Sequence, residues 1–395
     1  MLHEPARHAT PRHDDWEPAR VEAWLRRFAA DALAVRARGA WPVHPRDAED
    51  GAPPTFNCLY LGATGVWLAL ARLAAAGRCE LPGPLHEGFA EALAGIDRSP
   101  DVGVRAPSWF LGESAPLVAC CLTRPDAALA DRLAATIRGN RDNPTREALW
   151  GAPGTMLAAL FMHAASGEAR WADLYRDSAE ALWSSWFHDE ARGVWLWEQD
   201  LYGSRARYVG AGHGWAGNLH ALWRGCELLG AQQRAELRER TLQGLERLAV
   251  VEGDRANWPP TTAPGDKRLV QWCHGAPGVI TSLRHADAPE LLPWLLRGAR
   301  LIDEAGPLIK GVGLCHGTDG NGAALLELHR RTGDAAWLAR ARELAMVAIV
   351  QSEDLYEQTG GWRYSLWTGD AGLACYLLDC LEGRGRGMPG LDYFV

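Results

Sequence analysis

Apolar residues recur along most of the chain at the three- and four-residue spacing of amphipathic helices. A first helical segment runs from Asp15 to about Arg38, with Asp15 as a suitable N-terminal cap. Ala- and Leu-rich segments of the same kind then repeat, and most end near a glycine that would stop a helix. The pattern predicts an all-α chain behind a flexible N-terminal arm of residues 1–14.

The Ala- and Leu-rich segments share a start signal, a G-x-x-G turn. Six copies occur, and a degenerate seventh, GESA, begins at Gly112. Glycine is expected in these turns because it accepts positive φ and lets backbones approach closely. The glycine pairs are Gly62 and Gly65, Gly151 and Gly154, Gly214 and Gly217, Gly275 and Gly278, Gly317 and Gly320, and Gly369 and Gly372.

A second amphipathic helix is predicted between successive turns, for example over residues 84–96 and 171–186, so that the repeating unit is a helical hairpin. Hairpins repeating at irregular intervals of about 40 to 60 residues form an array, because none can bury its apolar face alone. Seven hairpins can close into an (α/α) toroid, an inner barrel of helices surrounded by outer helices, with an open solenoid as the alternative. Since neither end shows a polar capping repeat, we expect residues 15–395 to form one closed toroid domain.

Composition narrows the functional classes. The net charge of −8, without a Lys/Arg stripe, argues against nucleic acid as a partner. The N-terminal residues lack the apolar core of a signal peptide, and no apolar run reaches the roughly 20 residues of a membrane span. We therefore expect a cytoplasmic protein whose nine cysteines are thiols. Seven of them lie among apolar residues and are expected to be buried: Cys58, Cys79, Cys120, Cys121, Cys226, Cys375 and Cys380.

Histidine directly precedes the first glycine in three consecutive repeats, at His213, His274 and His316, and cysteine precedes two of these histidines, at Cys273 and Cys315. If the repeats are equivalent in space, these side chains face one another at one mouth of the ring. Two thiolates and an imidazole suit tetrahedral Zn²⁺, and three protein ligands leave a fourth position for an exogenous thiol or water. The motif alone leaves the third ligand open between His274 and His316.

The alternative interpretation of the two Cys-His pairs is purely structural: the thiols are buried in the core, and the histidines have hydrogen-bond partners within the protein. Two Cys-His-Gly triplets in adjacent, matched repeats weaken that interpretation. For the first three turns, where Leu61, Leu111 and Trp150 precede the glycine, an architectural role alone is expected.

The strings LVQWCHGAPG, KGVGLCHGTDGNG and GAGHGWAGNL, with the repeated glycine turns, resemble the lanthionine synthetase C-like family over roughly Phe56 to Leu381. The resemblance implies a seven-hairpin α/α toroid whose zinc is held by Cys273, Cys315 and His316. It also implies that His213 is the acid/base histidine.

Members of the peptide-cyclising kind add a cysteine thiol of a peptide to a dehydroalanine or dehydrobutyrine and form a thioether. Relatives of the eukaryotic kind bind glutathione and can add it to dehydroamino acids. The WCHG string, where dedicated cyclases tend to have tyrosine in place of His274, resembles the glutathione-binding branch more, as does Lys310 five residues before Cys315. The last motif departs from that branch, with Trp367-Thr368 where Phe-Glu is usual, which leaves the thiol substrate open between a peptide and glutathione.

Thiol addition at the β-carbon of a dehydroamino acid leaves an enolate that must be protonated at the α-carbon, and histidine has the most suitable pKa for this near neutrality. His213 is the first choice because no neighbouring cysteine draws it to the metal, and His274 is the second. Glu147, four residues before Gly151, could orient one of these histidines or exchange a proton with it, although the pattern favours an exposed helical glutamate.

Candidates for substrate binding are less specific. Lys310 and Arg363 could hold a substrate carboxylate, and a solvated lysine is an equally good interpretation of Lys310. Tryptophans in the longer segments before three glycine turns could line a cleft, with core packing as the alternative: Trp195, Trp197, Trp258 and Trp362.

Two other functions compete with thioether formation. One is a non-catalytic protein that only binds zinc and glutathione. The other is a carbohydrate-active enzyme on an α/α toroid, which needs two opposed carboxylates; Glu147, Asp319 and Asp370 could supply them, but the two Cys-His-Gly strings would stay unexplained.

Overall fold

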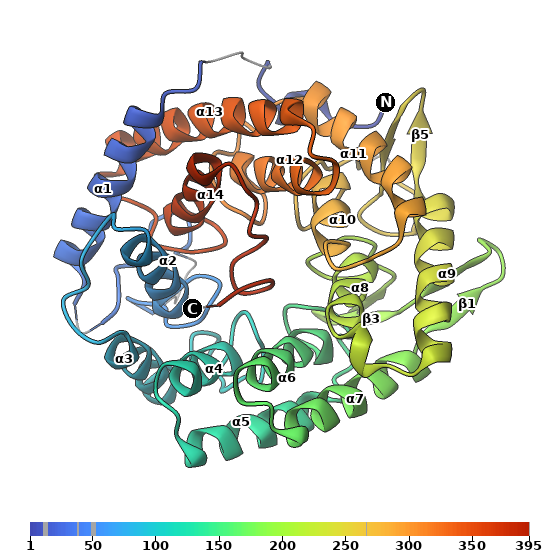
Figure 1. The fold of residues 1–395 in the computed structure, drawn as a ribbon, viewed down its shortest axis with the longest axis horizontal. Coiled ribbons are helices and arrows are strands. Elements are labelled where there is room, and N and C mark those ends of the chain that lie inside the picture. Colours follow the sequence, from blue (N-terminus) through green and yellow to red (C-terminus); the bar gives the residue numbers. More distant parts are fainter. Residues whose placement is uncertain (11–14, 38, 49–52, 266, 395) are drawn as a thin grey trace. The chain divides into compact units, whose positions relative to one another are not determined.

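The computed structural model describes residues 1–10, 15–37, 39–48, 53–265 and 267–394. Over these residues the chain forms fourteen α-helices and three two-stranded antiparallel hairpins (Figure 1). The prediction of a mostly helical chain is confirmed. The three short hairpins add to the predicted helices, and sequence periodicity did not reveal them.

No helix in the described ranges is both long and apolar enough to cross a bilayer. The chain divides into two compact units. The closed toroid and the single domain over residues 15–395 stay predictions, since both depend on how the units are joined. Unit 1 comprises Met1–Ala9, Pro107–Trp109 and Ala134–Gly306, and unit 2 comprises Thr10–Ala106, Phe110–Leu133 and Pro307–Val395.

Three consecutive helical hairpins form most of unit 1. The first helices of the three hairpins are α6, α8 and α10. Helix α8 packs on both α6 and α10, so the turns that precede these three helices are neighbours. Helix α5 (Ala127–Asn140) contributes residues to both units. The hairpins are α6 (Ala152–Ser166) with α7 (Ala169–Ser184), α8 (Trp215–Arg224) with α9 (Ala231–Leu248), and α10 (Ala276–Ser282) with α11 (Leu292–Ala305). The unit also contains three 3-10 turns, Pro5–Arg7, Cys226–Leu228 and Pro289–Leu291.

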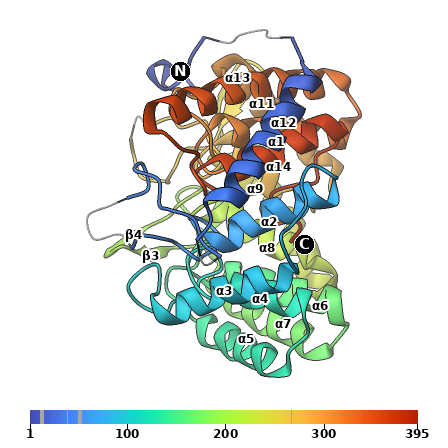
Figure 2. The same cartoon turned by 90° about the vertical axis from the view of Figure 1, so that its left-hand side faces the viewer.

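The strands of unit 1 are inserted between the helical segments. They are β1 (Phe187–Asp189) with β2 (Val194–Leu196), β3 (Gln199–Leu201) with β4 (Ser204–Ala206), and β5 (Val250–Glu252) with β6 (Arg255–Asn257). Leu201 pairs with Ser204, so only two residues connect β3 to β4. This hairpin projects from the helical part of unit 1 (Figure 2).

Residues 1–9, the first part of the predicted arm, pack on unit 1. Leu2 is buried, and its carbonyl accepts a hydrogen bond from Nδ2 of Asn257 at 2.8 Å. Residues 11–14 lie outside the described residues, and the flexibility of the arm stays a prediction.

Unit 2 contains the remaining helices. Helix α14 packs on α12, α13, α1 and α2, and α2 packs in turn on α3 and α4. Helix α1 begins at Pro18 after Glu17 instead of at the predicted Asp15 cap, because proline suits the first helical position. The helices are α1 (Pro18–Val35), α2 (Ala63–Ala75), α3 (Leu85–Arg98), α4 (Ser114–Thr123), α12 (Thr318–Thr332), α13 (Ala335–Thr359) and α14 (Asp370–Glu382).

The six G-x-x-G turns begin helices as predicted, with the first glycine as the N-cap of α2, α6, α8, α10, α12 or α14. A Cβ on the second glycine would collide with the carbonyl oxygen six residues earlier, as between Gly154 and Ala148, Gly217 and Ala211, or Gly320 and Leu314. Of the turn glycines only Gly275 has a positive φ, 120°. Close packing of the backbone, more than positive φ, therefore explains the motif.

Gly278→Ala is expected to lower the free energy of unfolding by about 1–3 kcal/mol, because the new Cβ would overlap the carbonyl of Trp272 and the side chain of Ala211. Gly139→Ala in α5 is the matched control, since no atom lies within 4 Å of its Cβ position, and it should be neutral or stabilising by up to about 1 kcal/mol. Urea unfolding measures both variants. Equal stabilities would contradict the steric explanation.

Candidate functional site

Four of the predicted site residues lie in the three neighbouring turns of unit 1. Glu147 lies before α6, His213 before α8, and Cys273 and His274 before α10. The amide of Gly212 donates to the carbonyl of Cys273 at 3.3 Å, which ties the second turn to the third. The packing of α6 on α8 and of α8 on α10 thus brings these residues together.

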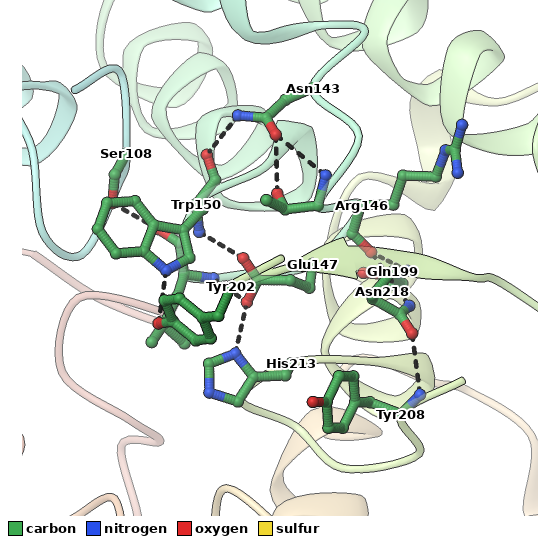
Figure 3. A network of polar contacts seen from close by, with 12 residues as sticks. Ser108, Asn143, Arg146, Glu147, Trp150, Gln199, Tyr202, Tyr208, His213 and Asn218 are labelled. Carbon is green, nitrogen blue, oxygen red and sulfur yellow. Dashed lines mark hydrogen bonds and ion pairs between the residues drawn. The ribbon is translucent and has the colours of Figure 1, made fainter. Parts of the chain in front are cut away.

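The buried Glu147 pairs with the half-buried His213 (Figure 3). Nδ1 of His213 lies 3.0 Å from Oε2 of Glu147, whose side chain is 0% exposed. The carboxylate also accepts the amides of Leu149 and Trp150, at 2.9 and 2.6 Å. The expectation of an exposed helical glutamate is therefore wrong. Glu147 lies in the turn before α6, where its carboxylate accepts the hydrogen bonds of amides that have no carbonyl partner in a helix.

This pair sets the protonation of His213. Burial acts to lower the pKa of His213, but the hydrogen bond and the negative charge of Glu147 outweigh it, so the pKa is raised above its ordinary value. The bond also fixes the ring, because a carboxylate at Nδ1 holds a proton on that nitrogen and leaves Nε2 for proton exchange. The arrangement can support general acid catalysis.

His274 lies beside His213. Their ring centroids are 6.0 Å apart, and the ring of Tyr208 lies 5.9 Å from His213 and 6.1 Å from His274. Nδ1 of His274 is buried and has no hydrogen-bond partner among the described residues. Burial lowers the pKa of His274, so its neutral form is favoured.

A pocket of about 480 Å³ opens over these rings. Its lining includes Tyr202 and two cations of the loop before α10, Lys267 and Arg268. None of the three was predicted, because nothing in the local sequence pattern marks them as site residues. The backbone amide of Arg268 is held by Glu4 at 3.0 Å. The tryptophans proposed for a cleft are not among the lining residues, and Trp197, Trp258 and Trp362 are buried, which agrees with the core-packing alternative.

Cys273 is buried in unit 1, and its Sγ accepts a hydrogen bond from Nε2 of Gln271 at 2.9 Å. Such a donor stabilises negative charge on sulfur, as a metal-ligating thiolate requires. Of the seven other cysteines five are buried as predicted, whereas Cys79 and Cys226 are only half-buried.

In unit 2, Cys315 and His316 precede α12. Cys315 is buried, and its amide donates to the carbonyl of Trp367 at 2.9 Å, while His316 is half-buried. This hydrogen bond holds Cys315 in the turn before the helix.

The two candidate substrate-binding cations also lie in unit 2. Lys310 is exposed. Arg363 is buried, and its guanidinium binds both carboxylate oxygens of Asp47, with Nε 2.7 Å from Oδ2. Because Asp47 balances this charge, Arg363 is held in place by the protein itself, and substrate binding by either cation stays a prediction.

Asp319 and Asp370 close turns of unit 2. Asp319 accepts the amide of Gly313 at 2.5 Å, and Asp370 accepts the amide of Arg363 at 2.7 Å. Both carboxyl groups are buried at the starts of their helices. This placement disfavours the carbohydrate-active alternative, in which carboxylates must reach a sugar from a cleft.

The burial of Asp319 predicts a pH-dependent stability. Burial raises the pKa of Asp319 to about 7, in spite of the hydrogen bond from Gly313. The folded state then holds this proton more tightly than the unfolded state, so its stabilising effect is full below about pH 4 and is lost as the pH rises to about 7. Relative to Asp319→Asn, the wild-type protein should lose stability across this window. Urea unfolding at three pH values tests this, and a constant difference would contradict it.

Comparisons with known proteins identify the family of the chain. One family model, lanthionine synthetase C-like protein, matches residues 53–392. The chain is 32% identical over 179 residues to the glutathione S-transferase LANCL1 of Danio rerio, covering 44% of this chain and 43% of that protein. It is also 32% identical over 145 residues to the LanC-like protein GCL1 of Arabidopsis thaliana, covering 34% and 33%. The chain thus spans less than half the length of these curated relatives.

A solved structure, that of nisin cyclase, has a similar fold. The TM-score is 0.63 at 12% sequence identity, and the match covers 93% of this chain and 95% of the cyclase. At this level of sequence identity, the likeness shows a shared fold alone.

Proposed function

Because the chain belongs to the lanthionine synthetase C-like family, we propose that it is a zinc-dependent enzyme that adds a thiol to a dehydroamino acid and forms a thioether. The observation that carries this proposal is the hydrogen bond between His213 and the buried Glu147. The turn of His213 is tied in addition to the turn of Cys273. Glutathione is the thiol favoured by the name of the Danio rerio relative, a glutathione S-transferase. A cysteine of a peptide is the other candidate.

The proposed zinc ligands are Cys273, Cys315 and His316. These residues are a group that could hold a metal ion, and two thiolates with one imidazole are a donor set that zinc prefers. Bound zinc would supply the acidity that converts a substrate thiol into its thiolate at neutral pH. Since Cys273 belongs to unit 1 and the other two ligands belong to unit 2, the proposal requires that the units bring these turns together.

The chain's own residues complete the reaction. Attack of the thiolate forms the S–Cβ bond and moves the electron pair of the C=C bond to the carbonyl oxygen, which gives an enolate. Protonated His213 then gives the proton on Nε2 to the α-carbon, and the proton released by the thiol restores His213. Glu147 orients the ring and stabilises its charged form.

Incubation of the purified protein with glutathione and a dehydroalanine peptide tests the proposal. Mass spectrometry should detect the glutathione thioether at a rate well above that of the same mixture without protein. Zinc in the protein without such a rate would instead support the alternative in which the protein only binds zinc and a thiol.

A further inference from the structure

Tyr202 occupies a backbone position that tyrosine disfavours. The connection between β3 and β4 consists of Tyr202 and Gly203, with φ angles of 52° and 75°. A two-residue hairpin turn with both φ angles positive corresponds to type I′, whose first position favours Asn, Asp or Gly. A bulky side chain there strains the backbone, and such strain is typical of functional sites.

The side chain of Tyr202 lies at the pocket beside His213. It is 72% exposed, although tyrosine has a large apolar ring. Its ring centroid is 6.3 Å from that of His213, at an interplanar angle of 78°. Its hydroxyl oxygen accepts a hydrogen bond from Nε1 of Trp150 at 2.9 Å, and the two rings meet edge to face (Figure 3).

Trp150 is a fixed support for this contact. Its amide donates to Oε1 of Glu147 at 2.6 Å, and its carbonyl accepts from Nδ2 of Asn140 and Nδ2 of Asn143 at 3.0 and 3.3 Å. Glu147 thus fixes both the histidine and the tryptophan that flank Tyr202. The strained turn holds Tyr202 against a rigid surface, with its ring and hydroxyl at the mouth of the pocket.

We infer that Tyr202, supported by Trp150, clamps the dehydroamino acid of the substrate over His213; this inference rests on the proposed function. A dehydroamino acid is planar and conjugated, so it can pack against an aromatic ring. A phenol has one proton to donate, and the bond from Trp150 uses only its oxygen. The proton is suited to the carbonyl oxygen of the substrate.

The same hydrogen bond would also act in the reaction. When sulfur bonds to the β-carbon, the electron pair of the C=C bond moves to this carbonyl oxygen, and the α-carbon later takes the proton from His213. Negative charge therefore develops on the oxygen that Tyr202 contacts, and a donor placed there stabilises the transition state more than the ground state. Tyr202 contributes both to binding and to rate.

Two substitutions separate the side chain from the turn. Tyr202→Asn provides the residue that a type I′ turn favours, so its melting temperature should equal or exceed that of the wild type. Its affinity for a dehydroalanine peptide, measured by calorimetry without any thiol, should fall about tenfold or more. Tyr202→Phe removes only the hydroxyl and should lower kcat for the addition of glutathione about tenfold, at unchanged zinc content. Tyr356→Phe, on α13 of unit 2, is the matched control and should change neither the affinity for the dehydroalanine peptide nor kcat.

The outcomes distinguish the clamp from the reaction. Wild-type affinity in Tyr202→Asn, or no binding of the peptide to the wild-type protein, would overturn the clamp whether or not thioether forms. If the wild type binds the peptide, Tyr202→Asn loses that binding, and no thioether forms, the clamp stands and the proposed function fails.

Discussion

Cys315→Ala is expected to lose zinc and thioether formation, whereas the wild-type protein should hold about one zinc per chain. The substitution removes one of two proposed thiolates and leaves only Cys273 and His316, too few protein ligands for a stable tetrahedral zinc site. Cys273→Ala should show the same loss, although Cys273 lies in the other unit. Elemental analysis of the purified proteins measures the metal, and the glutathione assay measures the reaction.

The controls for this experiment are cysteines outside the proposed site. Cys226→Ala in unit 1 and Cys79→Ala in unit 2 remove half-buried thiols and should keep both zinc and activity. Circular dichroism would show whether the variants without zinc are folded. Zinc retained at the wild-type level in Cys273→Ala or in Cys315→Ala would contradict the ligand assignment, and with it the convergence of the two turns.

Local signals in the sequence located the helices well. The segments predicted over residues 84–96 and 171–186 correspond to α3 and α7, with ends that differ by two residues or fewer. The glycine turns marked helix starts because their cause is local: the second glycine packs on the carbonyl six residues earlier in the same turn. The family prediction, which rested on the same turns and the two Cys-His-Gly strings, is confirmed.

Features that depend on distant residues could not be predicted in this way. The segment around Glu147 has helical composition, and its carboxylate is held both by the amides of Leu149 and Trp150 and by His213, which lies 66 residues away. Arg363 is paired with Asp47 across 316 residues, which no local pattern reveals. The β3–β4 strands have three residues each, too few for a period of two to stand out.

The role of Trp150 also depends on a residue far along the chain. Its turn was expected to be architectural, because no histidine or cysteine precedes the glycine. Trp150 occupies the position before α6 that His213 occupies before α8, and its indole reaches the strained Tyr202. Equivalent positions in the repeats therefore carry different side chains, both of which contact Tyr202. Equivalence of the repeats predicts the position of a residue better than it predicts its role.

His213→Ala is expected to lower kcat for thioether formation by about 10² to 10⁴, with zinc content unchanged, because it removes the proposed proton donor while leaving the ligands in place. His163→Ala, at a half-buried histidine of α6 in the same unit, is the control and should retain the wild-type rate. A wild-type kcat in His213→Ala would show that another group, with His274 as the first candidate, protonates the α-carbon.

Glu147→Gln tests how the carboxylate acts through His213, and we expect it to reduce kcat about tenfold or more. Because the hydrogen bond and charge of Glu147 raise the pKa of His213, their removal should lower that pKa and deplete the protonated form at neutral pH. The alkaline limb of the pH–rate profile should therefore move to lower pH in Glu147→Gln. Glu246→Gln, at an exposed glutamate of α9, should leave both the rate and the profile unchanged. A purely structural role for Glu147 would lower the melting temperature and the rate but leave the alkaline limb in place, since the charge state of His213 would not depend on it.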